Sequence, residues 1–170
     1  WSAETKYRLG NFQESLDEFI TFKKIASKEI KEYKFIDYNI GYSYFKLKEY
    51  STAAILFEKF INTNNEDMKM NDDATIRMGD SFFATKEYIK SINAYKKVVD
   101  QFGASADYAQ YQMAMSYGFL KNNDYKISQL ENLLTNFELS NFRDDALFQL
   151  GNSYSAQKEN KNAHRVYKTL

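Results

Sequence analysis

Apolar residues recur every three or four positions along this chain, in stripes separated by short polar stretches. This spacing places apolar side chains on one face of an α-helix. The chain has no proline and only six glycines, which favours long helices over sheet. We therefore predict an all-α protein made of paired helices. One such pair has these stripes: Ile36, Ile40, Tyr44 and Leu47, followed by Ala54, Phe57 and Phe60.

Four segments of the sequence can be laid over one another almost without gaps. They are Ile40–Tyr44, Met78–Phe82, Met113–Tyr117 and Leu150–Tyr154, with the small residues Gly41, Gly79, Ala114 and Gly151. Ala3 extends this series backward. Nine residues after each small residue the pattern predicts the start of a second helix, at Phe12, Tyr50, Tyr88, Asn123 and Asn160. A period of this length is typical of stacked repeat proteins.

We predict about five helix-turn-helix repeats in a single array over residues 1–170. The expected repeats are roughly 1–28, 29–66, 67–103, 104–138 and 139–170. Because the chain opens partway through a repeat, we expect it to be an excerpt of a longer protein. Terminal repeats need a polar outer face, so uncapped ends would allow self-association.

The small residue of each first helix has a physical reason. Where two antiparallel helices cross closely, a larger side chain would hold the backbones apart. The second helices carry matching small residues at Ser15, Ala53, Ser91 and Ala163. Their apolar stripes follow directly, and the last copy reads His164, Tyr167 and Leu170.

Polar residues mark several expected helix starts. Asn71–Asp73, Ser105 and Asn141–Asp145 place capping side chains or carboxylates near helix N-termini. The run Asn64–Met70 is the most loop-like stretch of the chain.

Composition excludes several classes of site. Lys plus Arg equals Asp plus Glu at 23 each, with the signs interspersed, which argues against a nucleic-acid surface. The densest basic stretch, Lys23–Lys34, also carries two glutamates and fits a solvated helix face better than an anion site. Without cysteine, neither disulfides nor thiolate metal sites are possible. No apolar run approaches the ~20 residues that span a bilayer.

Catalysis and cofactor binding are not expected. His164 is the only histidine and occupies a core-stripe position. No phosphate-binding loop, metal-ligand cluster or nucleophile–base pair can be assembled from the sequence.

The combined pattern resembles the tetratricopeptide repeat. The matching residues are Ile40, Gly41, Tyr44, Ala53 and Phe57 in the second repeat, and Met78, Gly79, Phe82, Ser91 and Tyr95 in the third. The family often closes its second helix with proline, which this chain lacks. The resemblance implies a right-handed superhelical α-solenoid whose first helices line a concave groove. The spacing is most similar to the bacterial cell-envelope branch, so a periplasmic or envelope location is favoured over a cytoplasmic one.

The groove implied by the resemblance is lined from positions six and three before each small residue, and one and four after it. In the second and third repeats these are Phe35, Tyr38, Tyr42 and Phe45, then Asp73, Ile76, Asp80 and Phe83. In the fourth and fifth they are Tyr108, Tyr111, Met115 and Gly118, then Asp145, Phe148, Asn152 and Ser155. Aromatic clusters on such a face mark binding surfaces, although long side chains that wrap inward would thicken the core instead.

Three functions remain open from the sequence. The first is a non-enzymatic scaffold or adaptor that binds a protein or peptide segment in the groove, with Asp73, Asp80 and Asp145 favouring a basic residue in that segment. The second is glycan capture on tyrosine platforms. The third is a regulatory repeat domain attached to another functional domain.

Overall fold

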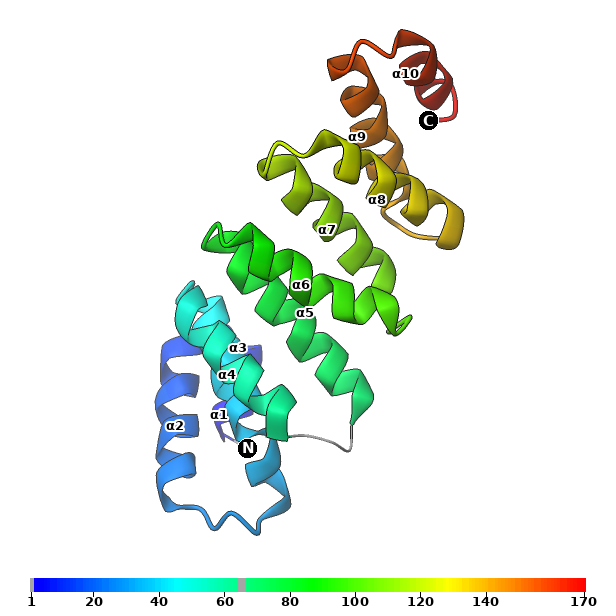
Figure 1. Ribbon diagram of the computed structural model, residues 1–170. Helices are drawn as coiled ribbons and strands as arrows, with labels where there is room; N and C mark the ends of the chain where they lie inside the picture. The colour runs from blue at the N-terminus through cyan, green and yellow to red at the C-terminus, as the bar shows by residue number, and fades with distance from the viewer. Residues whose placement is uncertain (1, 64–66) are drawn as a thin grey trace. The chain divides into compact units, whose positions relative to one another are not determined.

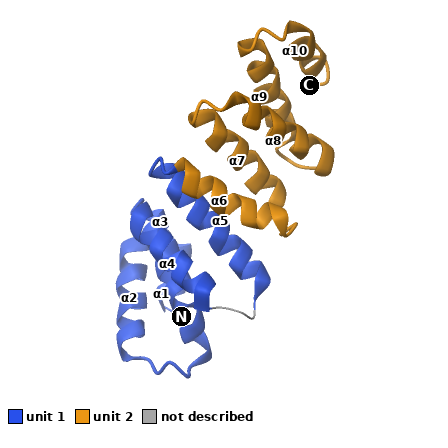
Figure 2. Ribbon diagram, viewed as in Figure 1, with its two compact units in different colours: residues 1–87 blue, residues 88–170 orange. Residues whose placement is uncertain are grey.

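The structure is a computed structural model that describes residues 2–63 and 67–170. Within these ranges the chain forms α-helices and one 3-10 helix, without a β-strand (Figure 1). The chain divides into two compact units, residues 1–87 and 88–170 (Figure 2). The division falls inside the expected third repeat. No helix of the described chain has both the length and the hydrophobicity needed to cross a membrane.

The first unit holds five α-helices in the described chain and the 3-10 helix. They are α1 (Ser2–Arg8), α2 (Phe12–Ile25), η1 (Lys31–Phe35), α3 (Ile36–Lys46), α4 (Tyr50–Thr63) and α5 (Met68–Ala84). Each α-helix packs against the next one along the chain, from α1 to α5. One part of its core lies under α1, α2 and α3 and contains Ala3, Leu16, Phe19, Ile36 and Ile40.

The second unit repeats the same arrangement of successive helices. They are α6 (Tyr88–Asp100), α7 (Ala106–Phe119), α8 (Asn123–Asn136), α9 (Arg143–Ala156) and α10 (Asn160–Tyr167). Its core includes Leu130, Leu133, Ala146 and Leu150, all buried.

The predicted starts of the second helices are confirmed. The helices α2, α4, α6, α8 and α10 begin at Phe12, Tyr50, Tyr88, Asn123 and Asn160. The turn before each of them contains one residue with positive φ: Gly10, Lys48, Lys86, Lys121 or Lys158. In the turn after α3, the amide of Lys48 donates to the carbonyl of Phe45 and that of Glu49 to Tyr44, at 3.1 and 2.9 Å. The other four turns have the same pair of hydrogen bonds, which is the Schellman ending of a helix.

The small residues lie at close helix contacts where the structure shows their neighbours. A Cβ atom built on Gly41 would lie 3.2 Å from Cε1 of Phe57, so a side chain at this position would press on the Phe57 ring of α4. In the first pair, the hydroxyl of Ser15 donates to the carbonyl of Ala3 at 2.8 Å. Ser15, Ala53, Ser91 and Ala163 are all buried.

Three sequence predictions about element details were wrong. Helix α5 begins at Met68, capped by Asp67, whose carboxylate accepts from the amide of Met70 at 3.0 Å. Asn71–Asp73 therefore lie inside the helix and do not cap it, and Met68–Met70 are not loop; residues 64–66 of that run lie outside the described residues. The last stripe is also shifted, because Ala163 and Val166 are buried on α10 whereas His164, Tyr167 and Leu170 are exposed.

Candidate functional site

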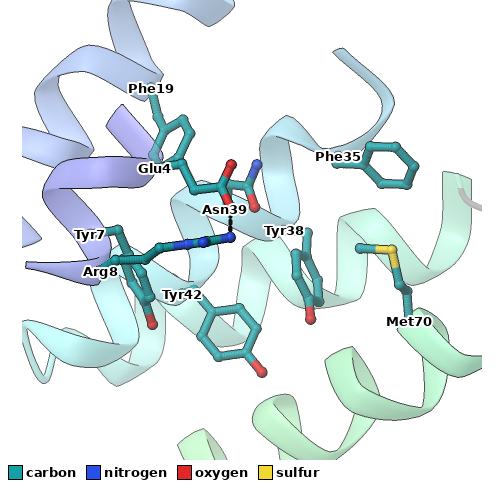
Figure 3. Close-up of a pocket in the computed structure, with 9 residues that line it drawn as sticks. All are labelled: Glu4, Tyr7, Arg8, Phe19, Phe35, Tyr38, Asn39, Tyr42 and Met70. Atoms are coloured by element: carbon teal, nitrogen blue, oxygen red, sulfur yellow. Dashed lines mark hydrogen bonds and ion pairs between the residues drawn. The ribbon is translucent and has the colours of Figure 1, made fainter. Parts of the chain in front are cut away.

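A pocket of about 460 Å³ opens in the first unit, between α1, α3 and the start of α5 (Figure 3). Phe35, Tyr38 and Tyr42 of the predicted groove line this pocket. The remaining lining residues are Glu4, Tyr7, Arg8, Phe19, Asn39 and Met70. The guanidinium of Arg8 pairs with Glu4 at 2.5 Å, so the charges in the lining balance.

The tyrosine rings that line the pocket pack against other aromatic rings of the first unit. The ring centroids of Tyr38 and Tyr42 lie 4.9 Å apart in an edge-to-face arrangement. Tyr42 meets the buried ring of Phe57 at 5.3 Å, and Tyr38 meets Phe60 at 5.1 Å. Tyr7 of α1 closes the series with its ring 6.3 Å from that of Tyr42. Apart from the tilted Tyr38–Phe60 pair, these contacts are edge-to-face, an arrangement that aromatic pairs prefer.

The tyrosine hydroxyls are satisfied within the chain. Tyr38 donates to Oδ2 of Asp73 at 2.8 Å, and Tyr42 donates to the same oxygen. Nε of Arg77 donates to the Tyr42 hydroxyl at 3.1 Å, and its Nη1 to Oδ2 of Asp80 at 2.6 Å. In Figure 3 the hydroxyl ends of Tyr38 and Tyr42 point the same way. We call Tyr38, Tyr42, Asp73, Arg77 and Asp80 the Asp73 network; it joins α3 to α5.

This network fixes the protonation of its tyrosines. Burial, together with the hydrogen bond to Asp73, raises the pKa of Tyr42 to about 12. Burial also raises the pKa of Tyr38, with Tyr42 and Asp73 adding to the effect. Both phenols therefore stay neutral donors at physiological pH. At these two positions the pocket wall presents neutral aromatic rings.

Other predicted groove residues of the first unit lie apart from the pocket lining. The ring of Phe45 packs on Tyr50 with centroids 5.4 Å apart. Ile76 is buried, and Phe83 is half-buried near the end of α5. Asp80 has a side chain only 8% exposed and bonded to Arg77, as Asp73 is to its own partners. Both carboxylates are therefore already engaged in contacts within the chain.

In the second unit, Tyr108 and Tyr111 gather around Phe142, a residue the sequence reasoning missed. The rings of Tyr111 and Phe142 are stacked, with their centroids 5.5 Å apart. The ring of Tyr108 is tilted relative to that of Phe142, and their centroids are also 5.5 Å apart. Met115 and Tyr111 both pack against the core of this unit. Phe148 is 50% exposed. Gly118 is half-buried, and a Cβ atom built on it would lie 3.1 Å from Cδ of Lys126. Asp145, Asn152 and Ser155 are exposed.

The sequence could have supplied part of what was missed. The spacing rule for groove positions, applied to the first repeat from Ala3, gives Glu4 and Tyr7, and both line the pocket. Met70 lies one turn before Asp73 and could be found only once α5 was known to start at Met68. Within residues 2–63 and 67–170, no group of three or more His, Asp or Glu side chains is arranged to hold a metal ion.

The comparisons with known proteins agree with this fold. A family model described as tetratricopeptide repeat matches residues 37–64, which span α3 and α4. No curated protein matches the sequence.

Solved structures with the same fold cover nearly the whole chain. They include MamA, with a TM-score of 0.81 and 16% identity over 98% of this chain and 90% of that one. For MamA from Desulfovibrio magneticus RS-1, from its residue 41 to the end, the TM-score is 0.78 and the identity is 17%, over 98% of this chain and 88% of that one. YrrB is described as a TPR protein with an unusual peptide-binding site. Its TM-score is 0.74 and its identity is 16%, over 96% of this chain and 78% of that one. The chain therefore contains a tetratricopeptide repeat at residues 37–64 and has the all-α solenoid fold of tetratricopeptide-repeat proteins.

Proposed function

We propose that this protein is a non-enzymatic scaffold that binds a segment of another protein, with the pocket in the first unit as the anchor site. The tetratricopeptide fold generally serves protein–protein interaction. The observation that carries the proposal is the pocket itself, whose walls are the rings of Tyr7, Phe35, Tyr38 and Tyr42. Rigid aromatic walls bury much apolar area at little cost in side-chain entropy.

The chemistry of the lining specifies the anchor. The hydroxyls of Tyr38 and Tyr42 already donate to Asp73, and Glu4 is already paired with Arg8. A charged anchor would compete with the Glu4–Arg8 pair for these partners. An aliphatic or aromatic side chain can enter the pocket without forming a polar contact to these groups. The side-chain amide of Asn39, which also lines the pocket, can form hydrogen bonds to the backbone of the bound segment. YrrB, which has the same fold, is described as having a peptide-binding site.

A pocket-filling variant tests this proposal more cleanly than tyrosine deletions, because the tyrosines also join α3 to α5. In Asn39→Trp, the indole would occupy the pocket from α3. Asn93→Trp adds the same side chain at an exposed position of α6 and serves as the control. We expect a protein captured from a lysate by the wild type and by Asn93→Trp to be lost with Asn39→Trp. Equal capture by all three proteins would contradict the anchor site.

Glycan capture is the second candidate. The rings of Tyr117 and Tyr125 stack 5.1 Å apart, and Tyr125 is 56% exposed. The exposed ring of Tyr125, backed by the half-buried ring of Tyr117, suits the apolar face of a sugar ring. A glycan array signal that Tyr125→Ala abolishes and Asn39→Trp leaves intact would favour this candidate over the first.

We also propose a periplasmic or cell-envelope location, on the spacing of the repeats alone. Fractionation of cells that produce the full-length protein tests it. Recovery in the cytoplasmic fraction would overturn this part of the proposal without affecting the anchor site.

A further inference from the structure

A second hollow, of about 520 Å³, lies between α2 and α4. Its lining includes Ile40 and Tyr44 of α3, whereas the anchor pocket uses Tyr38, Asn39 and Tyr42 of the same helix. Since successive residues of a helix are turned by about 100°, these two sets lie on opposite faces of α3. We call this hollow the α2–α4 groove. It is a separate surface from the anchor pocket.

The α2–α4 groove is apolar and continuous with the core. Its floor is Ile40, which is buried in the cluster with Leu16 and Phe19. Its walls are Ile20 of α2 and Ile55 and Leu56 of α4, with Tyr33 and Tyr44 beside them. Ile55 is 66% exposed. An apolar side chain inserted here would extend the existing core and cover Ile55.

The rim of the groove is positively charged. Lys23 and Lys24 line it, and no acidic residue is among the described residues that do so. Lys23 and Lys59 both bond the single carboxylate of Asp37, which leaves one positive charge in surplus. Lys24 adds another, because it lines the groove and forms no ion pair within the described chain. This surplus stands out in a protein whose formal net charge is zero.

The dimensions of the groove match two anchors on one helix. Each wall, Ile20–Lys24 and Thr52–Leu56, extends over about one helical turn. Side chains three or four residues apart on a partner helix are separated by roughly 5–6 Å, the same length. We propose that the α2–α4 groove binds an amphipathic helix of another protein, through two apolar side chains one turn apart, flanked by acidic residues that face Lys23 and Lys24.

Selection from a phage-displayed library of amphipathic helices tests this proposal. The library varies the apolar positions and gives each flanking position the choice of Glu, Gln or Lys. We expect the selected sequences to carry apolar pairs at i and i+3 or i+4 and Glu at the flanks. Their binding to Ile55→Glu should be weaker by about tenfold or more, because the new carboxylate lies in the wall and repels the acidic flank.

Two further variants keep the test specific. Ile89→Glu places the same substitution at an isoleucine of α6 that is 60% exposed, and should bind as the wild type does. Lys24→Glu should weaken binding and reduce its dependence on salt. Asn39→Trp should leave the selected helices bound, so that failure of the anchor pocket and failure of this groove are distinguishable.

Three outcomes would overturn the proposal. The first is a selection that yields no helix, or yields basic flanks. The second is equal affinity for Ile55→Glu and Ile89→Glu. The third is self-association of the wild type in sedimentation that Ile55→Glu abolishes, since the occupant would then be a second copy of this chain.

Discussion

The hydroxyl of Tyr42 in α3 donates a hydrogen bond to the carboxylate of Asp73 in α5, 31 residues further along the chain. Tyr38 donates to the same oxygen, so one carboxylate serves two tyrosines of the anchor pocket. The wall of the pocket and the packing of α5 on α3 therefore depend on the same side chain.

Replacing Asp73 with Ala should destabilise the protein by about 1–3 kcal/mol, because Tyr38, Tyr42 and Arg77 would each lose a partner in a half-buried setting. Urea unfolding followed by circular dichroism measures this difference. Asp100→Ala is the control, since it removes only an exposed pair with Lys96, worth about 0.3–0.5 kcal/mol. Equal losses in the two variants would contradict the role given to Asp73.

Asp37 should make the protein sensitive to acid. Burial acts to raise the pKa of Asp37, but hydrogen bonds from Lys23 and Lys59 outweigh it, and the net pKa is lowered. A carboxyl group with a lowered folded pKa stabilises the protein above its unfolded pKa of about 3.9, and that contribution is lost as the pH falls through the folded value.

The variant Asp37→Asn should therefore be less stable than the wild type near neutral pH, by about 1 kcal/mol given that Lys59 is half exposed and screened by water. The difference in stability between Asp37→Asn and the wild type should become smaller below about pH 4. Urea midpoints measured between pH 3 and 7 would reveal it. A gap that stays constant over this range would show that the two lysines do not act through the charge of Asp37.

The close contact at Gly41 should tolerate no large side chain. A Cβ atom there would lie 3.2 Å from the ring of Phe57 and 3.4 Å from Cβ of Leu56. Phe57 is fully buried and has little room to move. We expect Gly41→Leu to cost about 1–3 kcal/mol by overpacking, measured as a lower melting temperature. Ala156→Leu, at an exposed position of α9, should change it little.

Lysine occupies a left-handed position in the turn after α3. Lys48 has φ of 65°, a conformation in which glycine avoids the steric cost of a Cβ atom. Lys48→Gly should therefore stabilise the protein by about 0.5–1 kcal/mol. Lys46→Gly, two residues earlier and inside the helix, should instead destabilise it by about 1 kcal/mol. A loss of stability in both variants would argue against the turn geometry.

The sequence predicted what periodic local patterns determine. The starts of α2, α4, α6, α8 and α10 followed from the repeat alone. The start of α5 did not, because Asp67 offered a capping carboxylate four residues before the expected one. The left-handed turns were also missed, although the recurring pairs Lys48-Glu49, Lys86-Glu87 and Lys158-Glu159 marked three of them.

The candidate site was predictable by residue but not by contact. Phe35, Tyr38 and Tyr42 were identified because the repeat spacing puts them on one face of an expected helix, although Phe35 ends η1 and only the two tyrosines lie in α3. Their partner Asp73 lies in another helix, and only the packing of α3 on α5 decides whether its carboxylate faces solvent or the two hydroxyls. The same limit applies to Phe142, which precedes α9 and meets Tyr108 and Tyr111 through tertiary packing.

The Schellman turns reach no further than five residues back along the chain. The hydrogen bonds that close such a helical hairpin join only residues of the hairpin itself. The reversal of the chain therefore does not depend on the neighbouring repeats. Duplication of the underlying gene segment would thus yield a unit already able to bend back on itself. Substitutions at Tyr38 or Ile55 would then change which ligand binds, while the turn between the paired helices stayed the same.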